Sequence, residues 1–192
     1  MKSTTAAVAL LSATISMAAP TLNSRTPAAG SGYAVPSVVK IHSINNNLNT
    51  FSTATSTVRS GDFETSTLYD IPIPEAAAGK TCALVFKASD SDTVAGTGAL
   101  DISKNEFTDL ASLTEGNLRD QQLARIVYDP DTGLFDFDRA AFTATVDSFP
   151  CPAGKVLHWE AAAVGEVDTV VIQQDFSHDG AHVPNGLSVA FW

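Results

Sequence analysis

Apolar and polar residues alternate with a period of two along most of the chain beyond residue 64. In the segment 82–88, Leu84 and Phe86 fall on the same face as Cys82. The same alternation runs through 142–146, 157–161 and 170–173, and further apolar segments occupy 68–72, 98–103, 123–128 and 187–191. Gly, Pro and Asp separate these segments, as expected between short half-buried strands. The pattern predicts an all-β protein, an antiparallel β-sandwich of about 7–9 short strands.

One segment has a helical period instead. Phe107, Leu110 and Leu113 are spaced three residues apart, and Gly116 with Asn117 follows them. This spacing predicts one or two helical turns that end before Gly116. The role of the surrounding loop, residues 105–122, is not indicated by any motif.

The N-terminus has the organisation of a secretory signal. A short apolar run follows Lys2, and Ser16-Met17-Ala18 supplies the small residues of a cleavage site. We therefore predict a signal peptide over residues 1–18, cleaved between Ala18 and Ala19. The apolar run is too short to span a membrane and none follows it, so the sequence predicts a secreted, extracellular protein without a membrane span.

The chain contains two cysteines, Cys82 and Cys151, which are 69 positions apart. In an exported protein an even number of cysteines predicts a disulfide, and two cysteines allow one connectivity. On the chain-entropy model this bond stabilises the fold by about 4 kcal/mol. Two buried free thiols are the alternative interpretation.

Charge divides the chain near Gly61. Residues 19–61 contain no Asp or Glu and three basic residues, whereas residues 62–192 carry all 21 acidic and seven basic side chains, a net charge of −14. The first part is rich in Ser, Thr and Asn, which predicts a loose leader with one candidate strand at 38–43. The second part, 62–192, is predicted to be the acidic folded domain. The acidity argues against binding to nucleic acid or anionic membranes.

Two cysteine blocks carry a family resemblance. The motifs are Thr67-Leu68-Tyr69-Asp70-Ile71-Pro72, then Gly79-Lys80-Thr81-Cys82, then Phe149-Pro150-Cys151-Pro152, and Asn185-Gly186-Leu187 near the end. Over 62–192 the sequence resembles the fungal domain family named after the ubiquitin-three-binding protein But-two, its C-terminal domain. The resemblance implies a secreted, Cys-paired β protein without established catalytic residues. The family name also suggests a partner from the ubiquitin-like activation machinery. The predicted signal peptide and disulfide argue against this partner, because a membrane would separate a secreted protein from that machinery.

The carboxylates between Asp129 and Asp138 are the first candidates for chemistry. Asp131-Thr132-Gly133 spells the triplet of aspartic proteases, but no second copy exists, and Asp129-Pro130 before it favours a type I turn. The same aspartates do not match an EF-hand.

Histidines provide the second candidates. His178 and His182 are four residues apart, but Gly180 lies between them, so we predict a surface loop without a metal. His158 and Glu160 alternate on one strand and are predicted to share its solvent face, where they are capable of acting as base and acid. Neither pair gives a catalytic assignment.

Aromatic residues provide candidates for sugar stacking: Tyr69, Tyr128, Trp159 and Trp192, of which Trp159 is expected in the core. With no catalytic residue, metal or cofactor predicted, the leading hypothesis is a secreted, non-enzymatic protein with a structural or binding role, associated with cell-wall polysaccharide or another extracellular partner. The alternative is a small secreted hydrolase that uses carboxylates near Asp129–Asp138 or His158 with Glu160.

Overall fold

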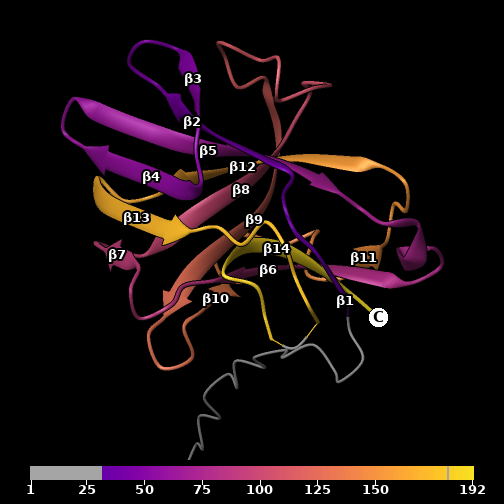
Figure 1. Cartoon of the computed structure of the whole chain (residues 1–192). Helices are drawn as coiled ribbons and strands as arrows, with labels where there is room; N and C mark the ends of the chain where they lie inside the picture. The colour runs from indigo at the N-terminus through magenta and orange to yellow at the C-terminus, as the bar shows by residue number, and fades with distance from the viewer. Residues whose placement is uncertain (1–31, 181) are drawn as a thin grey trace, which may run out of the picture.

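Fourteen strands join one antiparallel sheet in the computed structural model, which describes residues 32–180 and 182–192 (Figure 1). The first seven strands are β1 (Gly32–Ala34), β2 (Val38–Ser43), β3 (Leu48–Phe51), β4 (Ala54–Ser60), β5 (Phe63–Pro72), β6 (Thr81–Lys87) and β7 (Thr93–Ala95). The other seven are β8 (Ala99–Asn105), β9 (Arg119–Asp129), β10 (Leu134–Phe137), β11 (Phe149–Pro150), β12 (Val156–Ala163), β13 (Val167–Gln173) and β14 (Gly186–Phe191).

The sheet is curled like a half-barrel around its core (Figure 1). Its main order is β1-β14-β6-β10-β9-β8-β12-β5-β4-β13-β7; β11 pairs with β6, and the β2–β3 hairpin pairs with β5 through β2. One apolar cluster fills the curl and includes Tyr69 of β5, Trp159 of β12, Ile172 of β13 and Val189 of β14. The predicted all-β class is confirmed, but the predicted sandwich of seven to nine strands is wrong. The sheet closes over the core by curling, and the β8–β9 ladder contains two register shifts that allow a local bend.

Most predicted strands lie where the period-two pattern indicated, but two segments differ. Residues 142–146 alternate in exposure without joining a ladder, because Thr145 N donates to Leu123 O and Leu84 N donates to Val146 O on two different strands. The predicted helical turns near Phe107 are absent from the described residues, where the one helical element is the 3₁₀ turn Glu75–Ala77. Within 32–180 and 182–192, no helix has the length and apolar character needed to cross a membrane.

Residues 32–60 take part in the sheet. The candidate strand at 38–43 is β2, and β1, β3 and β4 accompany it in the segment that the sequence assigned to a loose leader. β4 pairs with β13 from Ala54 to Ser60, and Gly61 lies in the hairpin turn to β5 with φ of 57°. The change in charge near Gly61 therefore falls inside the sheet. The predicted signal peptide and its cleavage site at Ala18–Ala19 lie outside the described residues.

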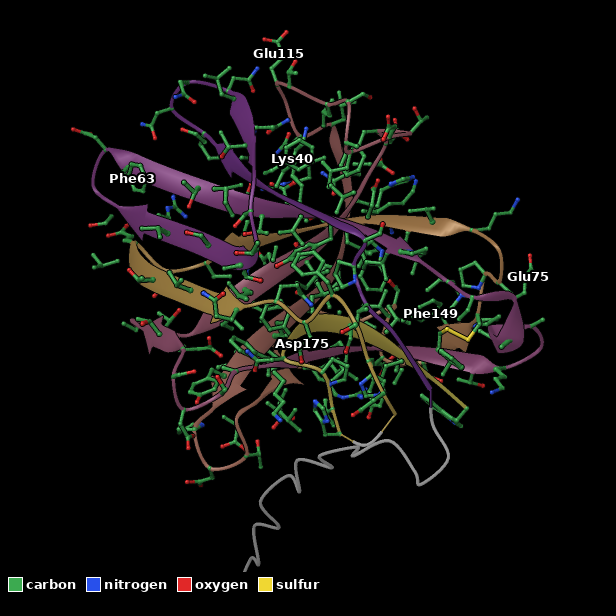
Figure 2. The ribbon with its side chains drawn as sticks, in the orientation of Figure 1. Lys40, Phe63, Glu75, Glu115, Phe149 and Asp175 are labelled. Atoms are coloured by element: carbon green, nitrogen blue, oxygen red, sulfur yellow. A yellow bond between two sulfur atoms is a disulfide. The ribbon has the colours of Figure 1, made fainter. Side chains whose placement is uncertain are left out.

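Cys82 and Cys151 form the predicted disulfide, visible as the yellow bond beside Phe149 in Figure 2. Cys82 is fully buried on β6, and Phe149 on β11 lies directly opposite it. The two Cα atoms are 4.9 Å apart across a sequence separation of 69 residues. The bond thus ties β6 to the segment that leads into β12.

Candidate functional site

An open groove of about 350 Å³ lies beside β1, at one end of the sheet order. Three segments that are far apart in sequence form it: residues 33–37, residues 72–74 and residues 176–178. Its lining consists of Tyr33, Ala34, Val35, Pro36, Ser37, Pro72, Pro74, Phe176 and His178. The volume falls within the range of about 300–1,000 Å³ that is typical of ligand pockets.

Backbone pairing fixes the first wall of the groove. Tyr33 lies opposite Ala190 of β14, and Gly32 sits over the ring of Phe191, where a Cβ atom would collide with that ring. Ser37 N then donates to Asp70 O at 2.8 Å and joins the turn after β1 to the end of β5. The side chain of Tyr33 is therefore presented from a fixed strand.

The loop between β13 and β14 forms the second wall. At its base Asp175 N donates to Asn185 O at 3.0 Å, and Asn185 N donates to the Asp175 carboxylate at 2.8 Å. The Asn185 amide also donates to Asp92 at 2.8 Å. These bonds close the base of the loop that carries Phe176 and His178; Asp175 is labelled in Figure 2.

The groove lining presents ring surfaces and contains no Asp, Glu, Lys or Arg side chain. Tyr33 packs edge-on against the His178 imidazole with ring centroids 4.8 Å apart, and burial raises the pKa of the Tyr33 phenol. Phe176 is exposed to 41 %. Because the whole chain has a net charge of −10, an uncharged, ring-lined groove is a local exception that suits a neutral ligand.

The predicted aromatic platform does not form. Tyr69 is fully buried and Trp159 is 3 % exposed, both inside the curled sheet. Tyr128 packs against Phe135 of the neighbouring strand, and Trp192 is exposed at the C-terminal end. Tyr33 and Phe176 were not among the residues predicted from the sequence. Prolines on two of the three segments were the available signal, since Pro36 follows β1, Pro72 ends β5 and Pro74 follows β5.

The aspartates between Asp129 and Asp138 support turns. The Asp129 carboxylate accepts hydrogen bonds from Asp131 N and from the Thr132 hydroxyl, each at 3.0 Å, in the predicted turn before Gly133. Asp138 accepts from two backbone N–H groups of the next turn at 3.2 and 3.1 Å. Asp136 lies between them on β10, where burial and the nearby Asp129 raise the pKa of its carboxyl. None of these carboxylates lines the groove beside β1.

Glu160 is fully buried, which corrects the prediction that it shares a solvent face with His158. Arg119 holds its carboxylate with two bonds, Nε to Oε2 at 2.9 Å and Nη2 to Oε1 at 2.6 Å. The amides of Asn105 and Asn117 donate to the same carboxylate at 3.0 Å. Burial alone would raise the pKa of Glu160, but the bonds from Arg119 and Asn105 lower it, so the carboxylate stays ionised.

Residues 106–118, which we call the strap, explain this burial, because they cross the outer face of the sheet. Leu110 of the strap packs on Leu68, and its N–H donates to Asp70 at 3.1 Å. Lys40 on β2 is 2 % exposed and donates to the Ala111 and Leu113 carbonyls, each at 2.9 Å. Figure 2 shows Lys40 beneath the strap and Glu115 at its tip.

His158 lies under the strap as well. Its Nδ1 donates to Asp70 Oδ1 at 2.6 Å, and its ring packs edge-on against Phe107 at 5.0 Å. His158 and Glu160 therefore have separate partners, Asp70 for the imidazole and Arg119 for the carboxylate. They do not form the acid–base pair that their alternation on one strand suggested.

Comparison with protein families agrees with the resemblance found in the sequence. The family model described as ubiquitin 3 binding protein But2 C-terminal domain matches residues 35–177. The match begins at the groove wall that follows β1, and so includes β2, β3 and β4 as well as the acidic part of the chain. No curated protein sequence matches this chain.

Proposed function

This chain belongs to the But2 C-terminal domain family, and from that premise and the geometry of the groove we propose that it is an extracellular, non-enzymatic protein that binds a neutral polysaccharide. The observation that carries the proposal is the groove lining of Tyr33, Phe176 and three prolines. Sugar rings present apolar C–H faces that pack on such side chains, as apolar surface does on aromatic rings in general. A neutral sugar also avoids repulsion from the acidic surface.

The extracellular part of the proposal rests on two features. The Cys82–Cys151 bond suits an oxidising compartment, and the N-terminal sequence has the organisation of a signal peptide. Expression in a secreting eukaryotic host tests it. We expect the protein in the medium with Ala19 as its first residue, and retention of the unprocessed chain inside the cell contradicts the proposal.

The non-enzymatic part is supported by how the predicted acid and base residues are used. Glu160 is buried against Arg119, His158 is bonded to Asp70, and Asp129 caps a turn. A hydrolase requires two such groups that converge on a cavity where substrate and water meet. Here each group has a structural partner instead.

Retention on insoluble polysaccharide tests the binding proposal. The secreted chain is incubated with β-glucan, chitin or mannan particles at low salt, and the bound fraction is compared with that on an uncharged agarose control. The test variant is Tyr33→Ala with Phe176→Ala. Its matched control is Phe63→Ala, because Phe63 is 56 % exposed on the β4–β5 hairpin. Phe63, labelled in Figure 2, lies on the opposite side of the molecule from β1, labelled in Figure 1 in the same orientation.

We expect one of the polysaccharides to retain the wild-type chain and the Phe63 variant equally. An aromatic stacking contact contributes about 0.5–1.5 kcal/mol, so loss of both groove rings should weaken binding about 5- to 150-fold. Equal retention of all three proteins places binding outside the groove, and no retention on any particle overturns the proposal. A parallel binding assay with ubiquitin-like proteins tests the partner that the family description names; binding there would replace the polysaccharide proposal.

A further inference from the structure

Three side chains of the β13–β14 loop converge at the edge of the groove. One potential ligand atom from each of His178, Asp179 and His182 lies within 4.8 Å of the other two. The two imidazole centroids are 5.7 Å apart with an angle of 75° between the rings. We propose that these residues form a binding site for a divalent transition metal of the Zn²⁺ type.

His178 provides an independent reason. Both of its ring nitrogens are shielded from solvent, and neither has a hydrogen-bond partner among the described residues. The other two histidines outside the cluster are satisfied, His42 by Asn49 at 2.8 Å and His158 by Asp70 at 2.6 Å. A shielded polar atom without a partner is unfavourable. A metal ion bound to one ring nitrogen of His178 would give that nitrogen a partner.

The donor set matches zinc chemistry. Two imidazoles and one carboxylate are the protein ligands of several catalytic zinc sites, and a fourth position is left for water or a ligand oxygen. Tyr33 packs edge-on against the His178 ring and restricts its orientation from the groove side. The site therefore adjoins the groove without using its aromatic walls as ligands.

The present spacing is slightly wider than that of a filled site. Ligand atoms on tetrahedral zinc lie about 3.4 Å apart. The donors here lie within 4.8 Å of one another, so the most widely spaced pair must approach by up to about 1.4 Å. His182 and Asp179 have side chains that are 59 % and 71 % exposed, with His182 Nδ1 at 3.6 Å from Asp179 Oδ1. Rotation of these two side chains can bring them toward the less exposed His178.

Zinc titration of the whole secreted chain tests the proposal. The protein carries no histidine tag, is stripped with chelator, and is titrated with Zn²⁺ alone by isothermal calorimetry. The variants are His178→Ala and His182→Ala, with the milder His182→Gln as a second version. Asp131→Ala is the matched control, because Asp131 is an exposed carboxylate on the β9–β10 turn and is not one of the three proposed ligands.

We expect one Zn²⁺ per chain, an unchanged affinity in the Asp131 variant, and an affinity at least about tenfold lower in each histidine variant. Cu²⁺ bound in place of zinc should show coupling to two imidazole nitrogens by electron paramagnetic resonance in the wild type and to one in His182→Gln. The proposal is overturned if the wild type shows no stoichiometric zinc binding, or if the histidine variants bind as the control does. The test involves no sugar, so it is decided separately from the polysaccharide proposal.

Discussion

Removal of Arg119 should destabilise the fold more than its partly exposed position suggests. Arg119 has a side chain that is 40 % exposed, but its partner Glu160 is fully buried. In Arg119→Met the apolar part of the side chain is retained and both charge-assisted bonds to the carboxylate are lost. Removing one partner of a buried ion pair costs about 3–5 kcal/mol. Since solvent reaches the arginine end of this pair, we expect about 2–4 kcal/mol.

Guanidinium denaturation at pH 7 measures this loss, and Arg125→Met is the matched control. Arg125 binds Asp101 with the same two-bond geometry, at 2.7 and 2.9 Å, but both side chains are partly exposed, at 29 % and 26 %. An exposed pair contributes about 0–1 kcal/mol. The difference between the two variants therefore isolates the effect of burying Glu160.

The pH dependence supplies a second measurement. In the wild type the pKa of Glu160 is lowered on folding, so its contribution is present above the unfolded pKa and is lost as pH falls through the folded pKa. In Arg119→Met, burial without the guanidinium should raise that pKa, and the variant then gains stability relative to the wild type as pH falls. The destabilisation measured at pH 7 should thus shrink toward pH 4.

A buried ion pair of this strength is refuted if Arg119→Met lowers the free energy of unfolding by no more than Arg125→Met does, or if its destabilisation is the same at pH 7 and pH 4. The double variant Arg119→Met with Glu160→Met gives a further check. The double variant removes the buried, unpaired Glu160 carboxylate and should recover part of the lost free energy of unfolding. The recovery is partial because the Asn105 and Asn117 amides lose their hydrogen-bond acceptor.

Three other outcomes follow from the structure. Cys82→Ser should lower the unfolding temperature by about 8–16 °C, because the disulfide contributes about 4 kcal/mol of loop-closure stabilisation. Calorimetry with and without reductant should show that reduction lowers the unfolding temperature of the wild type and leaves that of the variant unchanged. Lys40→Met removes two charge-assisted hydrogen bonds to carbonyls of the strap, so backbone amides in 106–118 should exchange hydrogen about 30-fold faster. Amides of β12 should keep their wild-type exchange rates. Unchanged exchange in the strap contradicts this role for Lys40. Burial and the nearby Asp129 raise the pKa of Asp136, so ionisation of Asp136 destabilises the fold as pH rises through its folded pKa. Asp136→Asn should therefore stabilise the protein at pH 7, and this stabilisation should disappear below the unfolded pKa of Asp136.

The sequence predicts which residues of a strand share a face more reliably than it predicts what covers that face. On β12, Trp159 and Ala161 lie in the core as the alternation indicated. Glu160 lies between them on the other face of the strand, and a polar residue that alternates with apolar ones ordinarily faces solvent. Its counterion, Arg119, is 41 positions away. The apolar spacing in the strap predicted helical turns and did not indicate that the segment lies across this face of the sheet. The prediction failed because burial of a polar face depends on a distant segment.

The groove was unpredictable for a related reason. Its rings come from residues 33, 72–74 and 176–178, and the ends of the sheet bring these segments together. No spacing rule connects positions so far apart. The disulfide was predictable in the same chain, because two cysteines permit a single pairing and composition alone identifies both partners.

The absence of acidic residues from β4 agrees with the way that β4 packs against β5. These strands pair by backbone only near their hairpin, from Val58 to Ser60. Beyond it, hydroxyl groups of β5 take over: Thr67 accepts from Ser56 N at 2.9 Å, and Thr65 donates to Ser56 O at 3.0 Å. A hydroxyl both donates and accepts, whereas a carboxylate accepts only and is costly to bury.

The threonines of β4 follow the same rule on the core side. Thr55 and Thr57 are fully buried, and the Thr55 hydroxyl bonds that of Tyr69 at 2.7 Å. A run of Ser and Thr predicts a segment outside the folded domain when the hydroxyl groups are assumed to face water. Here the hydroxyl groups fill the space between β4 and β5 where the two strands diverge. Groups in this position must be small and must bond both backbone N–H donors and carbonyl acceptors. The composition that suggested a leader is therefore what allows β4 to join the sheet.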